Sequence, residues 1–499
     1  MSVATATTIS ERQWSRTIVR IRRRRILRVT VTSLIVVALC CAYVIADVTD
    51  LIAGPLTLQP VERKTIPAAL SSRTAGMIAG IVDSSAAIDT AAAKQLIDAF
   101  GKTSGVGDHY SVAIAAADGT IVAQHEADTS REPASTMKTL TALAASSTLD
   151  MGSTLSTDVY LTDVDDSGGT GTLILRGNGD MLLSAGNNDP DHVNGRAGLG
   201  TLAARTAQAL RKQGVSSVTL MVDDSLFGSE RYPSDIADNN PDNLYYTGVS
   251  SLAIDGGRQW DGGAPADPDI FSAYPRLSQT TASDAANVFA ARLAEHGITV
   301  SNTTIDVAET EPATASDGLA PIASVESATL AEILAFTLRH SDNTLAEEFG
   351  RLTALAAGEN NTPQGATKAV RAALAALGID TDGLTMADCS GLSPGSKVSV
   401  KTLVEVQAHN LTASGAAAAA EGLSIPGLVG TAANRAVSDD TLGLLRVKTG
   451  SLSEVTSMTG NVSRIGGGTL AFSVIVNQPD DWAAAKDAID VFVDGLARL

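Results

Sequence analysis

A serine followed three residues later by a lysine constrains this chain more than any other stretch of its sequence. Ser135 and Lys138 lie in a run over 134–147 that is otherwise uncharged and prone to form a helix, and residues three apart share one face of a helix. A serine hydroxyl is a weak nucleophile at its own pKa, whereas a lysine desolvated by apolar neighbours can lose its proton and act as a base. The pair therefore predicts a nucleophile, Ser135, with Lys138 as its base.

Two further short motifs follow in order along the chain. Ser-Asp-Asn at 341–343 separates two stretches whose apolar residues recur at helical spacing, which predicts a tight turn between two helices. Lys-Thr-Gly at 448–450 closes a strand-like run that begins at 444. Each motif alone is weak evidence, but Ser-x-x-Lys, Ser-Asp-Asn and Lys-Thr-Gly in this order form the signature of serine β-lactamases and penicillin-binding proteins.

The distance between the first two motifs predicts an insertion. Ser135 and Ser341 are 206 positions apart, much farther than one helical layer needs to bring them together. We expect a serine peptidase domain over 86–149 and 316–499, interrupted by an inserted domain over 150–315. The insert shows both strand and helix patterns, which indicates a mixed α/β body. The flanking parts, with strands after helices and a final helix, predict an α+β domain.

The N-terminal region has the pattern of a membrane segment. Eight arginines stand within residues 1–28, and residues 29–46 carry no charge, a length that roughly spans a bilayer core of about 30 Å. Because excess positive charge marks the cytoplasmic side, we expect 1–28 in the cytoplasm, 29–46 as a transmembrane anchor or signal segment, and the later residues outside. The Ala/Ser-rich stretch 47–85 contains three prolines and predicts a stalk. Small or branched residues at 44–46 leave removal by a signal peptidase open.

Charge and titratable residues argue against several other functions. The chain has a net charge of −19, so the basic N-terminal block indicates topology, and no nucleic-acid partner is expected. The histidines show no ligand spacing such as His-Glu-x-x-His, so neither a metal nor a cofactor is expected. We interpret His340 as a solvated loop residue and Cys389, the single cysteine of the exported part, as a small apolar filler.

From about residue 87 to the C-terminus the sequence resembles the exported D-Ala-D-Ala carboxypeptidases/endopeptidases, the class C low-molecular-mass penicillin-binding proteins. Besides the three motifs, the resemblance rests on Gly-Asn-Gly-Asp at 177–180, Asp-Asp-Ser-Leu-Phe at 223–227, Asp-Cys-Ser-Gly-Leu-Ser at 388–393 and Gly-Thr at 430–431. Ser451 stands where the family usually has a threonine. The resemblance implies a transpeptidase domain like that of penicillin-binding proteins and serine β-lactamases, an antiparallel sheet flanked by helices.

The resemblance also implies acyl transfer on peptidoglycan stem peptides, with β-lactam antibiotics as inhibitors. Ser135 would attack the carbonyl between two D-alanines, and its backbone N–H would form the oxyanion hole with that of Ser451. Lys448 and Thr449 would bind the terminal carboxylate of the substrate. The implied catalytic residues are Ser135, Lys138, Ser341 and Asn343, and the implied substrate-binding residues are Lys448, Thr449, Gly450 and Ser451.

Two alternatives remain beside the peptidase. A serine β-lactamase uses the same acyl-enzyme with faster deacylation, but no Glu-x-x-Leu-Asn element that would supply its carboxylate base lies between Ser135 and Lys448. A non-catalytic envelope protein could use the fold to bind peptidoglycan, although the intact nucleophile argues against it. For the peptidase we expect a single-pass membrane protein with its catalytic domain outside, or a secreted protein if the N-terminal segment is cleaved.

Overall fold

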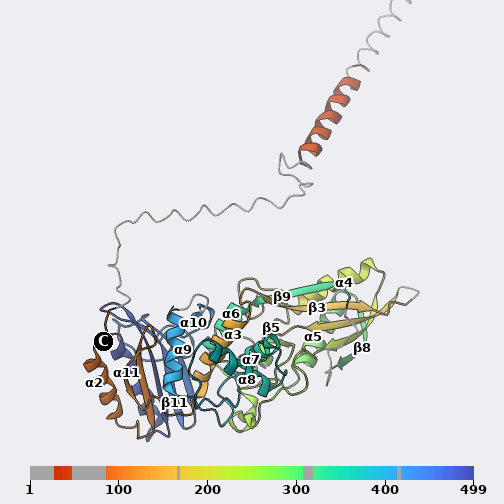
Figure 1. The fold of residues 1–499 in the computed structure, drawn as a ribbon. Coiled ribbons are helices and arrows are strands. Elements are labelled where there is room, and N and C mark those ends of the chain that lie inside the picture. The colour runs from red at the N-terminus through yellow and green to blue at the C-terminus, as the bar shows by residue number, and fades with distance from the viewer. Residues whose placement is uncertain (1–26, 28, 48–85, 166–168, 307–317, 413–416) are drawn as a thin grey trace, which may run out of the picture. The chain divides into compact units, whose positions relative to one another are not determined.

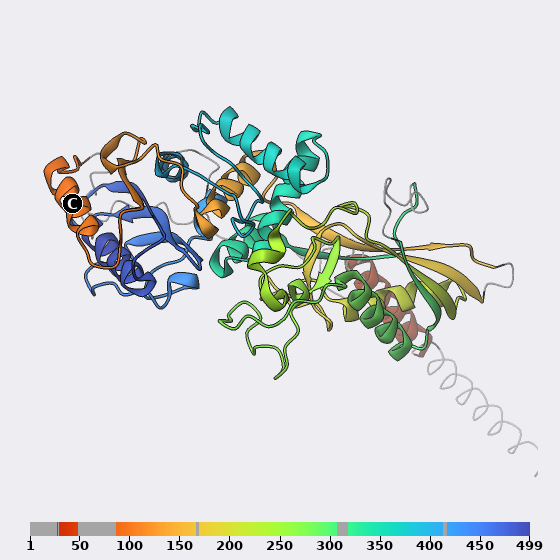
Figure 2. The ribbon, with the colours of Figure 1, turned by 90° about the horizontal axis from the view of Figure 1, so that it is seen from below.

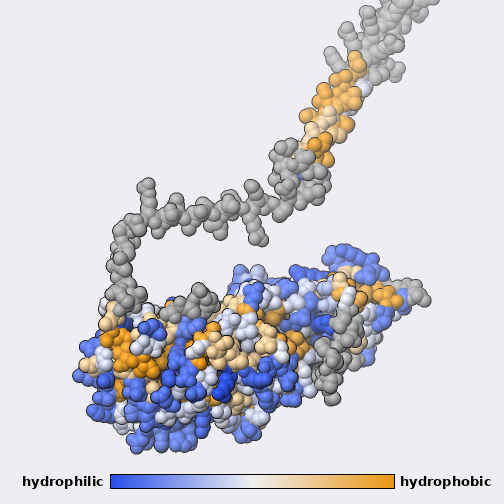
Figure 3. Space-filling model, viewed as in Figure 1, coloured by the Kyte–Doolittle hydropathy of each residue, from blue (hydrophilic) through white to orange (hydrophobic). Residues whose placement is uncertain are grey.

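The computed structural model describes residues 27, 29–47, 86–165, 169–306, 318–412 and 417–499 (Figure 1). The chain divides into two units, 1–81 and 82–499. In the first, helix Val29–Asp47 is long and apolar enough to cross a membrane, and hydrophobic residues cover most of its visible side (Figure 3). Apart from Leu27 and Asp47, the predicted basic segment 1–28 and stalk 47–85 lie outside the described residues.

The first sheet of the second unit is antiparallel and joins the two ends of that unit. Its strand order is β10-β11-β12-β1-β2. Strands β1 and β2 form an antiparallel hairpin. The strands are β1 (Tyr110–Ala116), β2 (Ile121–His125), β10 (Leu445–Leu452), β11 (Val455–Ser463) and β12 (Thr469–Asn477).

Side chains alternate between the two faces of this sheet, as the pleat requires. Val112 and Ile114 of β1 belong to a core shared with helices α2 (Thr90–Gly101) and α11 (Trp482–Leu496). Ala113 and Ala115 instead face a second core that includes α9 (Val400–Thr412). Helices therefore cover both faces, which confirms the predicted α+β class.

A layer of helices lies between this sheet and a second one (Figures 1 and 2). At its centre is α3 (Lys138–Thr148), whose first eight residues are all buried. Alanines and threonines in α3 leave little side-chain bulk, so neighbouring helices approach it closely. The helices of the layer are α3, α6 (Leu330–His340), α7 (Asn343–Ala357), α8 (Pro363–Ala376), α9 and α10 (Ala417–Glu421).

The second sheet lies largely within the predicted insert and is mixed. Its order is β8-β6-β4-β3-β9; β4–β6 and β6–β8 pair in parallel, whereas β3 pairs antiparallel with both neighbours. Apolar residues of one face share a core with α4 and α5. The elements are β3 (Thr154–Thr162), β4 (Thr170–Gly177), α4 (Leu199–Lys212), β6 (Ser217–Asp223), α5 (Thr281–Glu295), β8 (Thr299–Asp306) and β9 (Ala323–Thr329).

The division into a peptidase domain and an insert over 150–315 stays a prediction. Strand β9 extends the second sheet to Thr329, so the structure favours a boundary nearer to the start of α6. Short elements link the parts: β5 (Asp180–Leu183) pairs with β7 (Leu252–Ile254), and the 3-10 helices are η1 (Ala134–Met137), η2 (Ile236–Asn239), η3 (Pro241–Asn243), η4 (Asp255–Gly257) and η6 (Gly430–Ala432).

Candidate active site

Ser135 lies in a strained turn that leads directly into α3. The predicted helix starts at Ala134, but its first turn is the 3-10 helix η1 and the α-helix begins at Lys138. Ala134 has a φ of 50°, a left-handed conformation that is costly for a residue with a side chain. A Cβ at Gly391 would lie 2.0 Å from the Ala134 carbonyl oxygen, so only a glycine at 391 leaves room for this turn.

Lys138 is buried beside the Ser135 hydroxyl. Its side chain is 1% exposed, and its Nζ donates to Ser135 Oγ at 2.9 Å, to Asn343 Oδ1 at 2.6 Å and to the Ser390 carbonyl at 3.0 Å. Desolvation by burial lowers the pKa of Lys138 to about 7, although nearby carboxylates oppose the shift. The predicted pair therefore lies in hydrogen-bond contact, with an ammonium that loses its proton near neutral pH.

The Ser-Asp-Asn motif forms the predicted turn between α6 and α7. Ser341 ends α6 with a φ of 56°, and the Asp342 carboxylate caps α7 by accepting from the Leu345 backbone N–H. This cap fixes the first turn of α7. Asn343 consequently points its Oδ1 to Lys138, while its Nδ2 donates to the Tyr245 carbonyl at 2.8 Å.

Strand β10 brings the Lys-Thr-Gly motif to the same place. The buried Nζ of Lys448 donates to Ser341 Oγ at 2.9 Å and to the Thr449 carbonyl at 2.7 Å. Burial, followed by the charge of Lys138, lowers the pKa of Lys448 well below its usual value. The two lysines thus contact opposite members of the Ser341–Asn343 turn.

The outer edge of β10 faces this turn. Val447 exchanges backbone hydrogen bonds with Ser424 across that edge, and because backbone direction alternates along a strand, the N–H groups of Thr449 and Ser451 point the same way. A Cβ on Gly450 would lie 2.7 Å from the Pro133 carbonyl oxygen and 3.1 Å from the Ser135 nitrogen. Glycine at 450 therefore allows β10 to approach the Ser135 turn.

A cavity of about 760 Å³ opens over these residues. From the predicted set, Ser135, Ser341, Asn343, Thr449 and Ser451 line it, while Lys138 and Lys448 are buried beneath. Sequence reasoning missed the rest of the wall, because no pattern distinguishes a cleft aromatic from a surface one. The missed lining residues include Asp238, Asn239, Tyr245, Tyr274, Leu392 and Trp482.

The segment at 388–393 supports Lys138 from below. The buried carboxylate of Asp388 accepts backbone N–H groups of Ser390, Gly391 and Leu392 and the Ser390 hydroxyl, which fixes the Ser390 carbonyl that receives the lysine. Cys389 is fully buried, as expected of a small apolar filler.

The interpretation of His340 as a solvated loop residue is wrong. His340 is the last residue of α6, and its ring stacks on Phe271 with 4.1 Å between centroids. Burial, followed by the charge of Arg258, lowers its pKa. No sequence pattern indicated the loop that brings Phe271 onto this ring.

Comparison with known proteins agrees with this geometry. The model of the D-Ala-D-Ala carboxypeptidase 3 (S13) family matches residues 93–268 and 259–497, which is most of the chain. The chain belongs to the D-Ala-D-Ala carboxypeptidase 3 (S13) family. The S13 match spans the Ser135, Ser341 and Lys448 motifs and confirms the family resemblance inferred from them.

Individual relatives support the S13 assignment. The chain is 33% identical over 355 residues to carboxypeptidase DacB of Mycolicibacterium smegmatis, covering 69% of this chain and 71% of the relative. It is 28% identical over 424 residues to a D-alanyl-D-alanine carboxypeptidase of an Actinomadura species, covering 72% and 76%. The fold resembles penicillin binding protein 4 of Haemophilus influenzae, with a TM-score of 0.64 at 20% identity, over 83% of this chain and 100% of the other.

Proposed function

We propose that the protein is a serine-type D-Ala-D-Ala carboxypeptidase/endopeptidase that cleaves peptidoglycan stem peptides through an acyl-enzyme on Ser135. The observation that carries the proposal is the 2.9 Å contact between Ser135 Oγ and the Nζ of Lys138, whose pKa burial lowers to about 7. A base with a pKa near the working pH is effective in proton transfer. Membership of the S13 family supports the same reaction.

In the acylation step, Ser135 Oγ attacks the carbonyl carbon between the two D-alanines and passes its proton to Lys138. The tetrahedral oxyanion receives the backbone N–H groups of Ser135 and Ser451, donors aimed at the charge as it develops. Ser341, which accepts a hydrogen bond from Lys448, relays a proton to the leaving nitrogen. The C–N bond then breaks, D-alanine leaves as a free amine, and the acyl group stays on Ser135 until water hydrolyses the ester.

Substrate binding is assigned to Asn343 and to the β10 edge. Asn343 holds the substrate amide, and residues 448–451 bind the terminal carboxylate. Thr449 and Ser451 line the cavity directly, whereas Lys448 contributes its charge from beneath Ser341. Gly450 is assigned no contact with the substrate. Because it has no side chain, β10 can lie close to the Ser135 turn.

β-Lactams would acylate the same serine, because their ring amide presents a carbonyl beside a carboxylate. The β-lactamase alternative needs a carboxylate that activates water; Asp238, from the insert, lies in the cavity wall and gives that alternative a residue to test. A peptidase retains the penicilloyl group for long times, whereas a β-lactamase releases it within a catalytic cycle. The helix Val29–Asp47 supports a membrane anchor or signal segment, with the catalytic part outside the cell.

The decisive experiment is labelling with a fluorescent penicillin, followed by mass spectrometry of the labelled peptide. We expect stoichiometric label on Ser135 and none in Ser135→Ala, whose circular dichroism and melting temperature should match the wild type. Label that persists on the variant would refute the nucleophile, and a wild type that takes no label would favour the non-catalytic scaffold. The lifetime of the label, in wild type and in Asp238→Asn, separates peptidase from β-lactamase.

A further inference from the structure

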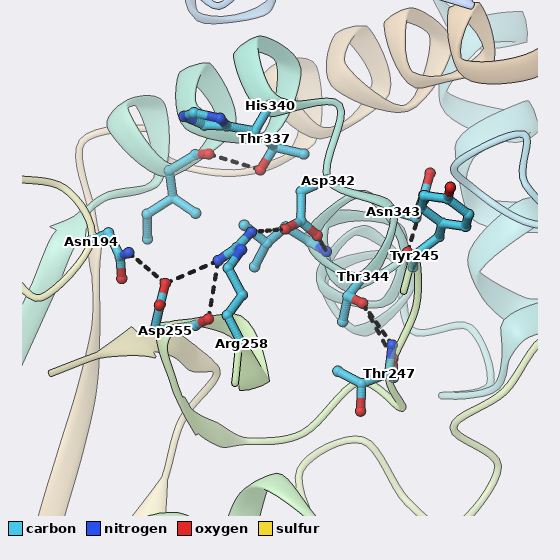
Figure 4. Close-up of polar contacts among 12 residues, drawn as sticks. Asn194, Tyr245, Thr247, Asp255, Arg258, Thr337, His340, Asp342, Asn343 and Thr344 are labelled. Atoms are coloured by element: carbon cyan, nitrogen blue, oxygen red, sulfur yellow. Dashed lines mark hydrogen bonds and ion pairs between the residues drawn. The ribbon is translucent and has the colours of Figure 1, made fainter. Parts of the chain in front are cut away.

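Arg258 joins the insert to the Ser341–Asn343 turn. Arg258 lies just after η4, and along the chain it is far from all three sequence motifs. Its side chain is only 6% exposed. One guanidinium nitrogen, Nη1, donates to the Asp255 carbonyl at 3.0 Å and to its Oδ1 at 3.1 Å. The other, Nη2, donates to Oδ2 of Asp342. Figure 4 shows Arg258 between these two carboxylates.

The insert side of this link is itself held in place. Asp255 Oδ1 also accepts from Asn194 Nδ2 at 2.6 Å, and its Oδ2 accepts from Trp260 Nε1 at 2.6 Å. Donors from two separate segments therefore orient the Asp255 carboxylate before it receives Arg258. A side chain anchored by such second contacts holds its partner in a narrow range of positions.

Aromatic rings enclose the guanidinium. Its carbon lies 4.5 Å from the Phe271 ring centroid and 5.7 Å from that of Phe336, geometry in which a cation is attracted to the ring face. The Asp342 side chain is 12% exposed, so water screens the ion pair little and the interaction is stronger than at the surface. Removing Arg258 would leave a largely buried carboxylate without its cation.

Asp342 uses its two oxygens for different purposes. Oδ1 caps α7 through the Leu345 N–H at 2.9 Å, and Oδ2 receives Arg258. The residues on either side of Asp342 are the two that reach the cavity, Ser341 and Asn343. Since Ser341 has a φ of 56°, the turn has little tendency to keep this shape unaided, and the position of Asp342 sets the position of both neighbours.

Two other residues hold the start of α7 to another segment of the insert, 245–247, through backbone groups of that segment. Asn343 donates to the Tyr245 carbonyl, and Thr344 Oγ1 accepts from the Thr247 N–H at 3.1 Å and donates to the Thr247 carbonyl at 3.3 Å (Figure 4). Substituting Arg258 leaves both in place. Its contribution can therefore be tested without detaching the helix.

We propose that Arg258 is a positioning residue for acyl transfer: through Asp342 it fixes Ser341 and Asn343 against the two lysines. The proposal rests on the proposed function of the site. Arg258 is not among the residues that line the cavity, so we expect it to act mainly on the alignment of the proton path. A residue of the insert thereby helps to fix the geometry of the catalytic site.

The test compares the variants Arg258→Met, Arg258→Lys and Asp342→Asn, and the double variant Arg258→Met/Asp342→Asn. Asn at 342 keeps an oxygen for the Leu345 cap but removes the charge that binds Arg258. Arg176→Met is the matched control, because Arg176 pairs with a buried aspartate, Asp223, at 2.6 Å within the second sheet. Stopped-flow measurement with a fluorescent penicillin gives the dissociation constant of the first complex and the acylation rate constant separately.

We expect Arg258→Met to lower the acylation rate constant about ten- to a hundred-fold, as a misalignment near 1 Å can do, with a change of less than about threefold in the dissociation constant. Arg258→Lys should recover only part of the rate, because a lysine lacks the planar fork that spans two carboxylates. The double variant should be little slower than the slower single variant, the mark of two residues acting as a unit. Arg176→Met should keep the wild-type rate constant.

The proposal would be overturned if Arg258→Met folds and its acylation rate constant stays within twofold of wild type. It would also be overturned if Arg258→Met and Arg176→Met lower this rate constant equally. If Arg258→Met does not fold, the double variant Arg258→Lys/Asp342→Asn replaces it in the comparison. A loss of acylation rate in that double variant equal to the sum of the losses in Arg258→Lys and Asp342→Asn would also overturn the proposal. Hydrogen exchange at the amides of 341–345 gives a readout without catalysis: it should be faster in Arg258→Lys than in wild type and Arg176→Met. If exchange responds while wild type takes no penicillin, the proposed function fails and the positioning link stands; unchanged exchange refutes the link.

Discussion

Lys448 donates a hydrogen bond to Ser341 Oγ over 2.9 Å, although the two residues belong to different motifs and stand 107 positions apart. Lys138 reaches the other end of the same turn through Asn343. The two buried lysine side chains are thus connected by residues 341–343. This arrangement gives Lys448 two possible contributions, to the substrate carboxylate and to the proton path, and the first prediction separates them.

Lys448→Ala should lower kcat/KM on a D-Ala-D-Ala substrate about ten- to a hundred-fold or more, because charge-assisted hydrogen bonds contribute on the order of 1.5–3 kcal/mol. Part of the loss should appear in KM, since the carboxylate contact exists before the reaction begins. The control is the same peptide with its terminal carboxylate amidated, which should be a poor substrate for wild type and lose much less on mutation. Equal losses on the two peptides would move Lys448 into the proton path at Ser341.

The pH profile of acylation should report Lys138. Its pKa is lowered by burial to about 7, and only the neutral amine accepts the Ser135 proton, so the acylation rate constant should rise about tenfold per pH unit below 7 and level off above it. Penicillin acylation measured from pH 5 to 9 checks this. A rate constant that is flat across that range, in a protein that stays folded, would contradict Lys138 as the base.

Gly450→Ala should slow acylation by an order of magnitude or more and lower stability by about 1–3 kcal/mol. The new Cβ would lie 2.2 Å from Ser457 Oγ and 2.7 Å from the Pro133 carbonyl oxygen, so β10 must move away from the nucleophile turn. Gly466→Ala is the control, because a Cβ there meets nothing within 4 Å. If both variants keep the wild-type melting temperature and labelling rate, the close approach at 450 has no role.

Asp180 should make the protein less stable as pH rises. Burial raises the pKa of this carboxyl to about 7, above that of an unfolded aspartate, so the folded state holds a proton that the unfolded state releases between about pH 4 and 7. The contribution of this proton to the free energy of unfolding is complete below about pH 4 and is lost as the pH approaches about 7. The free energy of unfolding of Asp180→Asn minus that of wild type should therefore be larger at pH 8 than at pH 5, by on the order of 2–4 kcal/mol. Urea unfolding at the two pH values measures this difference, and the exposed Asp439→Asn is the control. If Asp180→Asn differs from wild type by the same amount at both pH values, Asp180 does not make stability depend on pH.

The N-terminal segment should export the rest of the chain. A reporter fused after Leu499 and active only outside the membrane should be active with the full chain and inactive when residues 1–46 are deleted, because the arginines hold their end in the cytoplasm. The mass of the mature protein then decides whether helix Val29–Asp47 is retained. A fusion active only with a cytoplasmic reporter would refute this topology.

Much of the site followed from local sequence patterns, because the catalytic motifs lie at the ends of regular elements. Apolar periodicity on both sides of 341–343 predicted the turn that the structure has, and the strand-like run before Gly450 became the edge strand β10. The α+β class also followed from the order of strands and helices.

The parts that the sequence did not reveal depend on contacts made across the fold. Arg258, Asp255 and Asn194 lie in short or irregular segments of the insert without any periodic pattern, and their partners are brought together only when the chain is folded. The 3-10 geometry at Ser135 and the φ of Ala134 are likewise imposed by Gly391 and β10 packing against the turn. His340 was misjudged for the same reason, since Phe271 arrives from a distant loop.

The pairing of β1 with β12 also sets the order in which the protein can become active. Hairpin β1–β2 and Ser135 are synthesised early, but their sheet partner ends at Asn477, and the ribosome needs on the order of tens of seconds to add the intervening residues. Until then the serine has no β10 beside it and the hairpin has an open edge, a state prone to wrong pairing. We therefore expect the nascent chain to be unable to acylate until strand β12 (Thr469–Asn477) has been made.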